Sequence, residues 1–252
     1  MPFTFSHAAA TFVFSPWLKQ NRLSLTGIIL GCIAPDFEYF LRMKMQGDIG
    51  HNLVGIFLLD LPVALIVAFI FHCLIRDELI SNSPLFFKRK FVKFKNIKWF
   101  SYFKNNVLIV VVSVLLGIST HILWDSFTHK TGYFVVHFSF LQRELLLYEL
   151  RIPIYKILQH SSALLGLLAV IFYLFRMPSS AQVKRKAIRK YWGCVFLFLI
   201  IFMSIWASFN PSLINHIVHI IVALIACTFW SLVFVSTMFK FYKIISINKK
   251  TA

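Results

Sequence analysis

A histidine and an aspartate stand four residues apart near the end of a long apolar run. These residues are His121 and Asp125, and His129 follows after four more positions. On a helix, residues at this spacing lie one turn apart on the same face. Imidazole and carboxylate groups are the ligands that divalent transition metals such as zinc prefer. An H-x-x-x-D spacing also arises by chance, so the prediction of a metal site depends on which other candidate ligands the fold brings near.

The composition is that of a polytopic membrane protein. Of the 252 residues, 59% are hydrophobic and only 14% are charged, about half the charged share of a soluble domain. The net charge is +17, but the basic residues lie between the apolar stretches. The positive-inside rule therefore explains them better than nucleic-acid binding does. The four cysteines are isolated, and without a C-x-x-C pair a thiolate zinc site is not expected.

The apolar stretches predict an all-α, polytopic transmembrane helical bundle. We expect a single integral membrane domain over residues 1–245, followed by a tail at 246–252. Residues 1–41 contain two shorter apolar segments, which predict a helical hairpin that dips into the membrane and is buried in protein. Five stretches have the ~17–25 residues that a membrane span requires, namely 53–75, 107–125, 161–176, 191–209 and 216–239.

The distribution of charge predicts the orientation of these spans. The connection 76–106 is strongly basic, as are residues 176–190 and the end of the chain, so all three are expected in the cytoplasm. The connection 126–160 has nearly balanced charge and is expected outside. The C-terminus is therefore predicted to be cytoplasmic.

This topology places the candidate ligands on the extracytoplasmic face. Chance placement would have divided them between the two faces, so their gathering favours one site. Each also has a structural alternative, because interfacial histidines often face water and a loop carboxylate is often solvated. The candidate ligands gathered there are His7, Asp36, His51, His121 and Asp125, with His129 and His160 on the same face. Glu38, His129 and His160 are predicted as additional ligands or as groups that support the ligands.

Such a cluster predicts a metal-dependent hydrolase. It would hold one to three divalent ions, and the ligand types favour zinc first and manganese second. Asp36, His121 and Asp125 are expected to be catalytic through the metal and the hydroxide that it generates near neutral pH. The outer interface is where lipid head groups lie, so a phosphoester of a lipid is the predicted substrate, and the lipid bilayer is the predicted partner.

Several motifs carry a resemblance to a known family. They are Met1-Pro2-Phe3-Thr4 with His7, the segment 31–40 containing Ala34-Pro35-Asp36, His51, the segment 119–129, and the segment 155–162. Over about residues 1–240 the chain resembles a bacterial membrane-protein family known as a domain of unknown function. It is more distantly similar to membrane-bound metal-dependent hydrolases and to zinc-dependent phospholipase C.

The resemblance implies the same five metal ligands and a location in the bacterial inner membrane. Two departures from the pattern are visible. Asn52 follows His51 where a His-Ser pair is expected, and Ala8 stands where proline is usual. Neither departure removes a ligand.

A non-enzymatic membrane protein is the alternative. A carrier or a structural partner would use its interfacial His and Asp residues without catalysis. A carrier, however, needs polar residues that continue through the bundle, and Asp60 is the only acid predicted at such depth. The sequence therefore favours the hydrolase.

Overall fold

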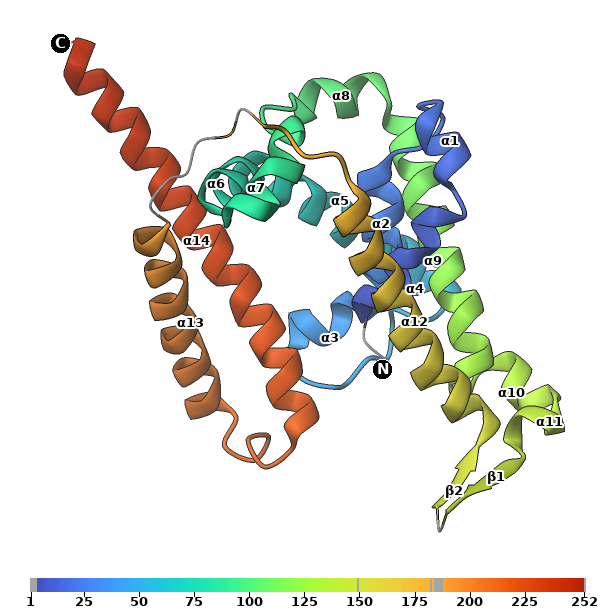
Figure 1. The fold of residues 1–252 in the computed structure, drawn as a ribbon. Coiled ribbons are helices and arrows are strands. Elements are labelled where there is room, and N and C mark those ends of the chain that lie inside the picture. The colour runs from blue at the N-terminus through green and yellow to red at the C-terminus, as the bar shows by residue number, and fades with distance from the viewer. Residues whose placement is uncertain (1–3, 149, 182, 184–187, 252) are drawn as a thin grey trace. The chain divides into compact units, whose positions relative to one another are not determined.

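The computed structural model describes residues 4–148, 150–181, 183 and 188–251 (Figure 1). Its regular structure is almost entirely helical, as the sequence predicts. Five helices are long and apolar enough to cross a membrane, since each has the roughly 20 residues that a bilayer requires. The chain is therefore an all-α integral membrane protein.

The five predicted spans are confirmed, although several of the helices extend beyond them. The candidate membrane helices are Leu53–Asn82, Val107–His137, Ile154–Arg176, Arg189–Phe209 and Ile217–Ser246. A helix satisfies its own backbone hydrogen bonds, so it continues through flanking polar residues where apolar periodicity alone would end it. The first span accordingly includes Arg76, Asp77 and Glu78.

The chain divides into two compact units. Unit 1 comprises Met1–Phe37, Asp48–Leu65 and Asn106–Arg176, and unit 2 comprises Glu38–Gly47, Ile66–Asn105 and Met177–Ala252. Unit 1 contains the helices η1 (Thr4–Phe12), α1 (Ser15–Lys19), α2 (Leu25–Ile33), η2 (Ala34–Asp36), α4 (Leu53–Gly55), η3 (Ile56–Asp60), α9 (Val107–Thr128), α10 (Tyr133–His137), α11 (Ser139–Gln142) and α12 (Ile154–Arg176). Unit 2 contains η4 (Phe71–Ile75), α6 (Arg76–Asn82), α7 (Leu85–Phe91), η5 (Val92–Phe94), α8 (Trp99–Asn105), α13 (Arg189–Phe209), α14 (Ile217–Thr251) and, except for Phe37, α3 (Phe37–Arg42). Helix α5 (Leu61–Ile70) is divided between the units after Leu65.

Helices α2 and α9 form the core of unit 1. Glycines stand where the two backbones meet, and a Cβ added at Gly31 would lie 2.1 Å from the carbonyl oxygen of Val114. Small residues let helices approach this closely. The N-terminus of α2 is fixed as well, because the Ser24 amide donates to Ser113 Oγ over 2.8 Å. The crossing therefore places the end of α2 beside the C-terminal half of α9.

Two stretches predicted as connections contain structure of their own. Residues 76–106 carry α6, α7, η5 and α8, and residues 126–160 carry α10, α11 and the start of α12. The second stretch also contains an antiparallel hairpin of β1 (Glu144–Leu147) and β2 (Leu150–Pro153), in which Leu145 pairs with Ile152. These strands were not predicted, because the short Leu-rich run lacks the alternation typical of a half-buried strand.

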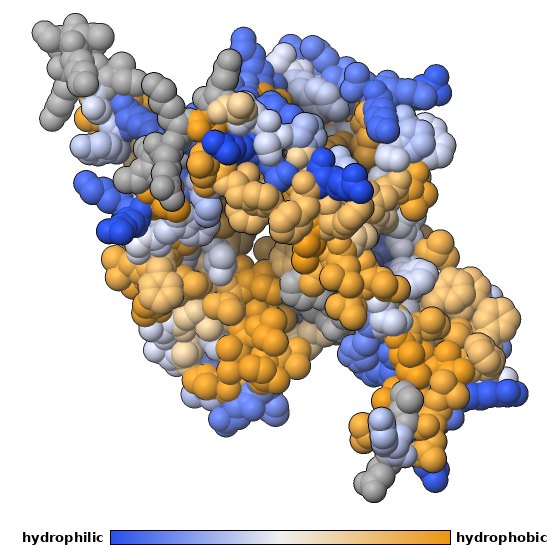
Figure 2. Space-filling model, in the orientation of Figure 1, coloured by the Kyte–Doolittle hydropathy of each residue, from blue (hydrophilic) through white to orange (hydrophobic). Residues whose placement is uncertain are grey.

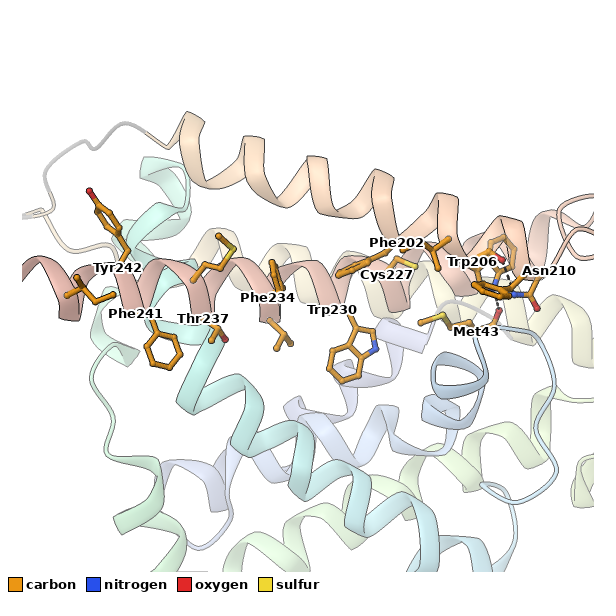
Figure 3. Close-up of a pocket in the computed structure, with 15 residues that line it drawn as sticks. Met43, Phe202, Trp206, Asn210, Cys227, Trp230, Phe234, Thr237, Phe241 and Tyr242 are labelled. Atoms are coloured by element: carbon orange, nitrogen blue, oxygen red, sulfur yellow. Dashed lines mark hydrogen bonds between the residues drawn. The ribbon is translucent and has the colours of Figure 1, made fainter.

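Unit 2 is centred on the α13–α14 helix pair. Tyr191 and Val195 of α13 pack with Val235 of α14 in its buried core, and the Tyr191 hydroxyl is 2.8 Å from Ser236 Oγ. A cavity of about 1030 Å³ lies along the same pair and is lined almost wholly by apolar side chains such as Phe202 and Trp230 (Figure 3).

The helix surfaces are apolar, as a lipid environment requires. On α12, Leu164, Leu165 and Phe172 are exposed, and on α13 Phe196 and Leu197 are exposed. Figure 2 shows apolar side chains over both helices. In a soluble protein such contiguous apolar surface would be a liability, whereas in a membrane it faces lipid chains.

Candidate metal centre

Unit 1 brings together all five of the predicted metal ligands. His7 comes from η1, Asp36 from the end of η2, His51 from the segment before α4, and His121 and Asp125 from α9. Ligand atoms of His7, His121 and Asp125 all lie within 4.8 Å of one another. The same holds for Asp36, His51 and His121, so His121 belongs to both groups.

The buried ring of His121 directs its Nε2 atom at two carboxylates. Its Nδ1 lies 2.7 Å from the carbonyl oxygen of Cys32. A carbonyl only accepts, so Nδ1 donates, and Nε2 is the atom that would carry the lone pair when the ring is neutral and binds a metal. That Nε2 is buried without a hydrogen-bond partner among the described residues. It lies 3.3 Å from Asp125 Oδ2 and 3.9 Å from Asp36 Oδ1.

Asp36 is held by one oxygen, and its other oxygen faces the cluster. Thr4 Oγ1 donates to Asp36 Oδ2 over 2.6 Å. Asp36 Oδ1 lies 4.0 Å from His51 Nε2, on the opposite side from the Thr4 bond. Burial raises the pKa of the Asp36 carboxyl, and this effect is opposed first by His121 and then by the hydrogen bond from Thr4. A cation beside Oδ1 would favour the carboxylate in the same way.

Asp125 faces three further imidazoles besides that of His121. Its Oδ1 lies 3.7 Å from His7 Nε2 and 3.4 Å from His129 Nδ1, and Oδ2 lies 3.8 Å from His51 Nε2. Oδ1 is buried and has no hydrogen-bond partner among the described residues. Unsatisfied buried carboxylate oxygens are costly, so a group of opposite charge is expected there.

His7 is neutral at physiological pH. Its ring stacks on that of His121, with centroids 4.0 Å apart and planes 19° from parallel. Burial, and next the neighbouring His121 ring, lower the pKa of His7 to about 3. A neutral imidazole is the form that binds metal, so His7 needs no deprotonation to act as a ligand.

His129 lies next to the cluster and is oriented from its far side. Lys156 Nζ donates to Gln159 Oε1 over 3.0 Å, which leaves the amide nitrogen to donate to His129 Nε2 at 3.1 Å. The proton of the neutral His129 ring is therefore on Nδ1, the atom that faces Asp125. In this arrangement His129 supports Asp125 and has no lone pair to offer a metal.

The two remaining predicted residues take no part in the cluster that these distances define. The His160 side chain is exposed. Glu38 is buried in unit 2, where its Oε1 accepts from the Arg42 guanidinium at 2.7 Å. Sequence reasoning missed Thr4, Gln159 and the Cys32 carbonyl. Thr4 and Gln159 stand in the same sequence motifs as the predicted histidines, and this closeness is the signal that could have identified them.

The donor set and its spacing fit a transition metal. Three imidazoles and two carboxylates are the ligand types that zinc prefers, and bonds of about 2.0–2.2 Å put ligand atoms roughly 3.3 Å apart around a tetrahedral ion. The 3.3 Å between His121 Nε2 and Asp125 Oδ2 is already at that value. The other histidine–carboxylate separations among the five ligands are 3.7–4.0 Å, so a bound ion would draw these atoms closer together.

The comparisons with known proteins give a family but no activity. The model of a domain of unknown function, DUF4184, matches residues 1–238. This match confirms the resemblance to a family of unknown function. No curated protein and no solved structure matches the chain. The more distant similarity to hydrolases therefore stays a prediction.

Proposed function

The chain belongs to the DUF4184 family, and we propose that it is a membrane-bound metal-dependent hydrolase. The proposed ligands are His7, Asp36, His51, His121 and Asp125, which would hold one to three divalent ions, with zinc favoured by the donor set. Manganese is the second choice, because carboxylates also suit it.

One observation carries this proposal. His121 Nε2 and Asp125 Oδ1 are buried polar atoms without hydrogen-bond partners among the described residues, and both belong to the same cluster. His121 is oriented on its far side by the Cys32 carbonyl, which lies against Nδ1. Ligands oriented in this way are typical of metal centres. A cation between them would satisfy both atoms.

The chain's own residues would position the reaction. A divalent ion supplies Lewis acidity, by which water becomes a nucleophile near neutral pH. His121, Asp36 and Asp125 are the proposed catalytic residues, because they would hold that ion. His51 has 35% of its side chain exposed and His129 has 30%, whereas His121 is fully buried. Substrate would therefore enter past His51 and His129.

We place the cluster on the extracytoplasmic side of a bacterial inner membrane, with the C-terminus in the cytoplasm. The distribution of lysine and arginine between the connections supports this orientation. His51 directly precedes the span Leu53–Asn82, so the cluster is expected at the level of the lipid head groups. A lipid phosphoester is accordingly the proposed substrate.

Metal content tests the proposal first. The protein would be purified in detergent without chelator, and its metals would be measured by mass spectrometry beside those of a His121→Ala/Asp125→Ala variant. Near-stoichiometric zinc or manganese in the wild type, absent from a folded variant, is the expected result. If the wild type binds no metal even after re-exposure to zinc and manganese, the hydrolase proposal fails.

Activity is the second test. Loaded protein would be offered short-chain phospholipids, and release of the head group or of its phosphate would be followed. We expect turnover that a chelator abolishes and that returned metal restores. Metal binding without turnover on any lipid phosphoester would instead favour the non-enzymatic alternative, a carrier or structural protein.

A further inference from the structure

Besides the apolar cavity along α13 and α14, unit 2 contains a second cavity, which is lined by charged and aromatic residues. Its volume is about 440 Å³. It is lined from the end of η4 and the start of α6, from the start of α8 and from α14. The residues that matter to its chemistry are Arg76, Asp77, Asn96, Lys98, Trp99 and Lys240.

Arg76 is buried in the wall of this cavity and is held rigidly. Its Nε donates to Asp77 Oδ1 at 2.7 Å, and a terminal nitrogen donates to the Ile97 carbonyl at 3.0 Å. The other terminal nitrogen lies 2.8 Å from His72 Nδ1, which accepts because a guanidinium only donates. Three of the five guanidinium N–H groups are thereby used. The other two have no hydrogen-bond partner among the described residues and are left for a ligand such as phosphate, which arginine binds well.

Part of the lining is aromatic. The His72 ring stacks on Trp99, with centroids 4.1 Å apart and planes 8° from parallel. Since His72 Nδ1 accepts from Arg76, the neutral ring keeps its proton on Nε2 and adds no charge to the cavity. Phe100 also lines the cavity and is exposed. An apolar wall beside fixed donors is typical of a site for an amphipathic ligand.

The charge lining the cavity is positive. Arg76, Lys98 and Lys240 contribute three cations, and Asp77 is the one acid among the lining residues. Asp77 Oδ1 already accepts from Arg76 and from the Asn96 amide, the latter at 3.1 Å. Lys240 donates to the Cys73 carbonyl at 2.9 Å, which holds its ammonium group without neutralising it. The cavity therefore favours an anion.

We propose that this cavity binds a phosphate group, with the spare Arg76 donors, Lys98 and Lys240 as its contacts. The phosphate could come from an anionic lipid head group or from free phosphate, and Trp99 and Phe100 favour the lipid. On the orientation proposed above this end of the protein faces the cytoplasm, whose leaflet is rich in anionic lipids. Apart from that orientation, the inference is independent of the metal cluster.

Binding of a soluble lipid tests the inference directly. Dioctanoyl phosphatidic acid and inorganic phosphate would be titrated into the detergent-solubilised full chain by calorimetry. A Lys98→Gln/Lys240→Gln variant should bind at least about tenfold more weakly, because charge-assisted bonds to phosphate are lost. The single variant Lys98→Gln is expected to fold, since Lys98 is exposed, and it tests the cavity should the double variant misfold. Lys104→Gln is the matched control, an exposed lysine of α8 outside the cavity.

Each outcome decides the question. Lipid binding that weakens in the Lys98 and Lys240 variants but not in Lys104→Gln, with phosphate bound poorly, assigns the site to a lipid head group. Equal binding of inorganic phosphate assigns it to the free anion. If neither ligand binds the wild type, or if the double variant binds as the wild type does, the inference is overturned. Loss of metal from the His/Asp cluster would leave these results unchanged.

Discussion

His121 and His72 are both buried histidines on membrane helices, and each uses Nδ1 for one hydrogen bond. The bonds have opposite directions. His121 Nδ1 donates to the Cys32 carbonyl, which leaves Nε2 among carboxylates as the atom available to a metal. His72 Nδ1 accepts from Arg76, so its lone pair is already satisfied. The direction of one hydrogen bond therefore separates a candidate metal ligand from a histidine that holds an arginine.

The groups around the two rings extend the contrast. Around His121, imidazole nitrogens and the oxygens of two carboxylates converge at 3.3–4.0 Å. Around His72, donors exceed acceptors, because three cations line a cavity with one carboxylate. The first arrangement is stabilised by a cation and the second by an anion. Burial and residue type are similar at both histidines, so neither property alone distinguishes them.

The largest predicted effect is on metal affinity, when each of the two histidines is exchanged in turn for glutamine. His121→Gln removes the ligand shared by both candidate groups. The metal affinity should fall well beyond the ~10–100-fold that loss of a supporting hydrogen bond costs. His72→Gln should leave metal content unchanged. Isothermal titration of apo protein with zinc measures both variants, and equal losses in the two would contradict the comparison.

The second prediction concerns the helix crossing that positions the cluster. Gly31→Ala would put a Cβ 2.1 Å from the Val114 carbonyl oxygen, and such overpacking typically costs ~1–3 kcal/mol. We expect a lower melting temperature and weaker zinc binding, because the Cys32 carbonyl that orients His121 moves with α2. Gly193→Ala in unit 2 is the matched control, since nothing lies within 4 Å of its added Cβ. A melting temperature of Gly31→Ala at or above that of the control would refute this account.

The sequence predicts the spans and the ligand set for identifiable reasons. Apolar length sets the number of membrane helices, and the four-residue spacing of His121 and Asp125 already places them on one helical face. The orienting contacts could not be predicted in that way. Thr4 reaches Asp36 across 32 positions, and His121 reaches the Cys32 carbonyl across 89. A backbone carbonyl has no signature in residue type, so only the α2–α9 crossing reveals it.

The π-helical turns of the first span were also beyond prediction. Ile56–Asp60 and Phe71–Ile75 are π-helices, and they contain Asp60 and His72 respectively. Such a turn inserts one residue into the helical repeat and so rotates all later side chains. Apolar periodicity is too uniform in a membrane helix to show this shift. The sequence therefore predicted the span but not which of its faces carries each polar residue.

The third prediction is a pH dependence of the apo protein. The pKa of His7 is about 3 in the folded chain, against 6.5 for an unperturbed histidine. Between these values the unfolded chain binds a proton that the folded chain does not. The free energy of unfolding is therefore at its full value above pH 6.5 and decreases as the pH falls below it, by at most about 1.4 kcal/mol per pH unit.

Thermal melts between pH 7 and pH 5 in the presence of a chelator measure this loss. His7→Gln lacks the titrating ring, so its melting temperature should fall less over the same range. An identical slope in the variant and the wild type would mean that His7 is not buried as a neutral ring.

The smallest predicted effect tests the support behind Asp125. Gln159 is buried and donates to His129 Nε2, while Lys156 holds its carbonyl oxygen. Gln159→Leu keeps the side-chain volume similar but removes the donor, so the proton of His129 is no longer fixed on the side of Asp125. A metal centre that loses one such supporting bond typically loses about tenfold or more in affinity. His160→Ala, which changes the exposed neighbour of Gln159, should bind zinc as the wild type does, because its ring lies outside the cluster. Were His160→Ala to lose zinc while Gln159→Leu kept it, His160 would be the ligand that the sequence suggested, and the orientation of His129 derived from Lys156 and Gln159 would be wrong.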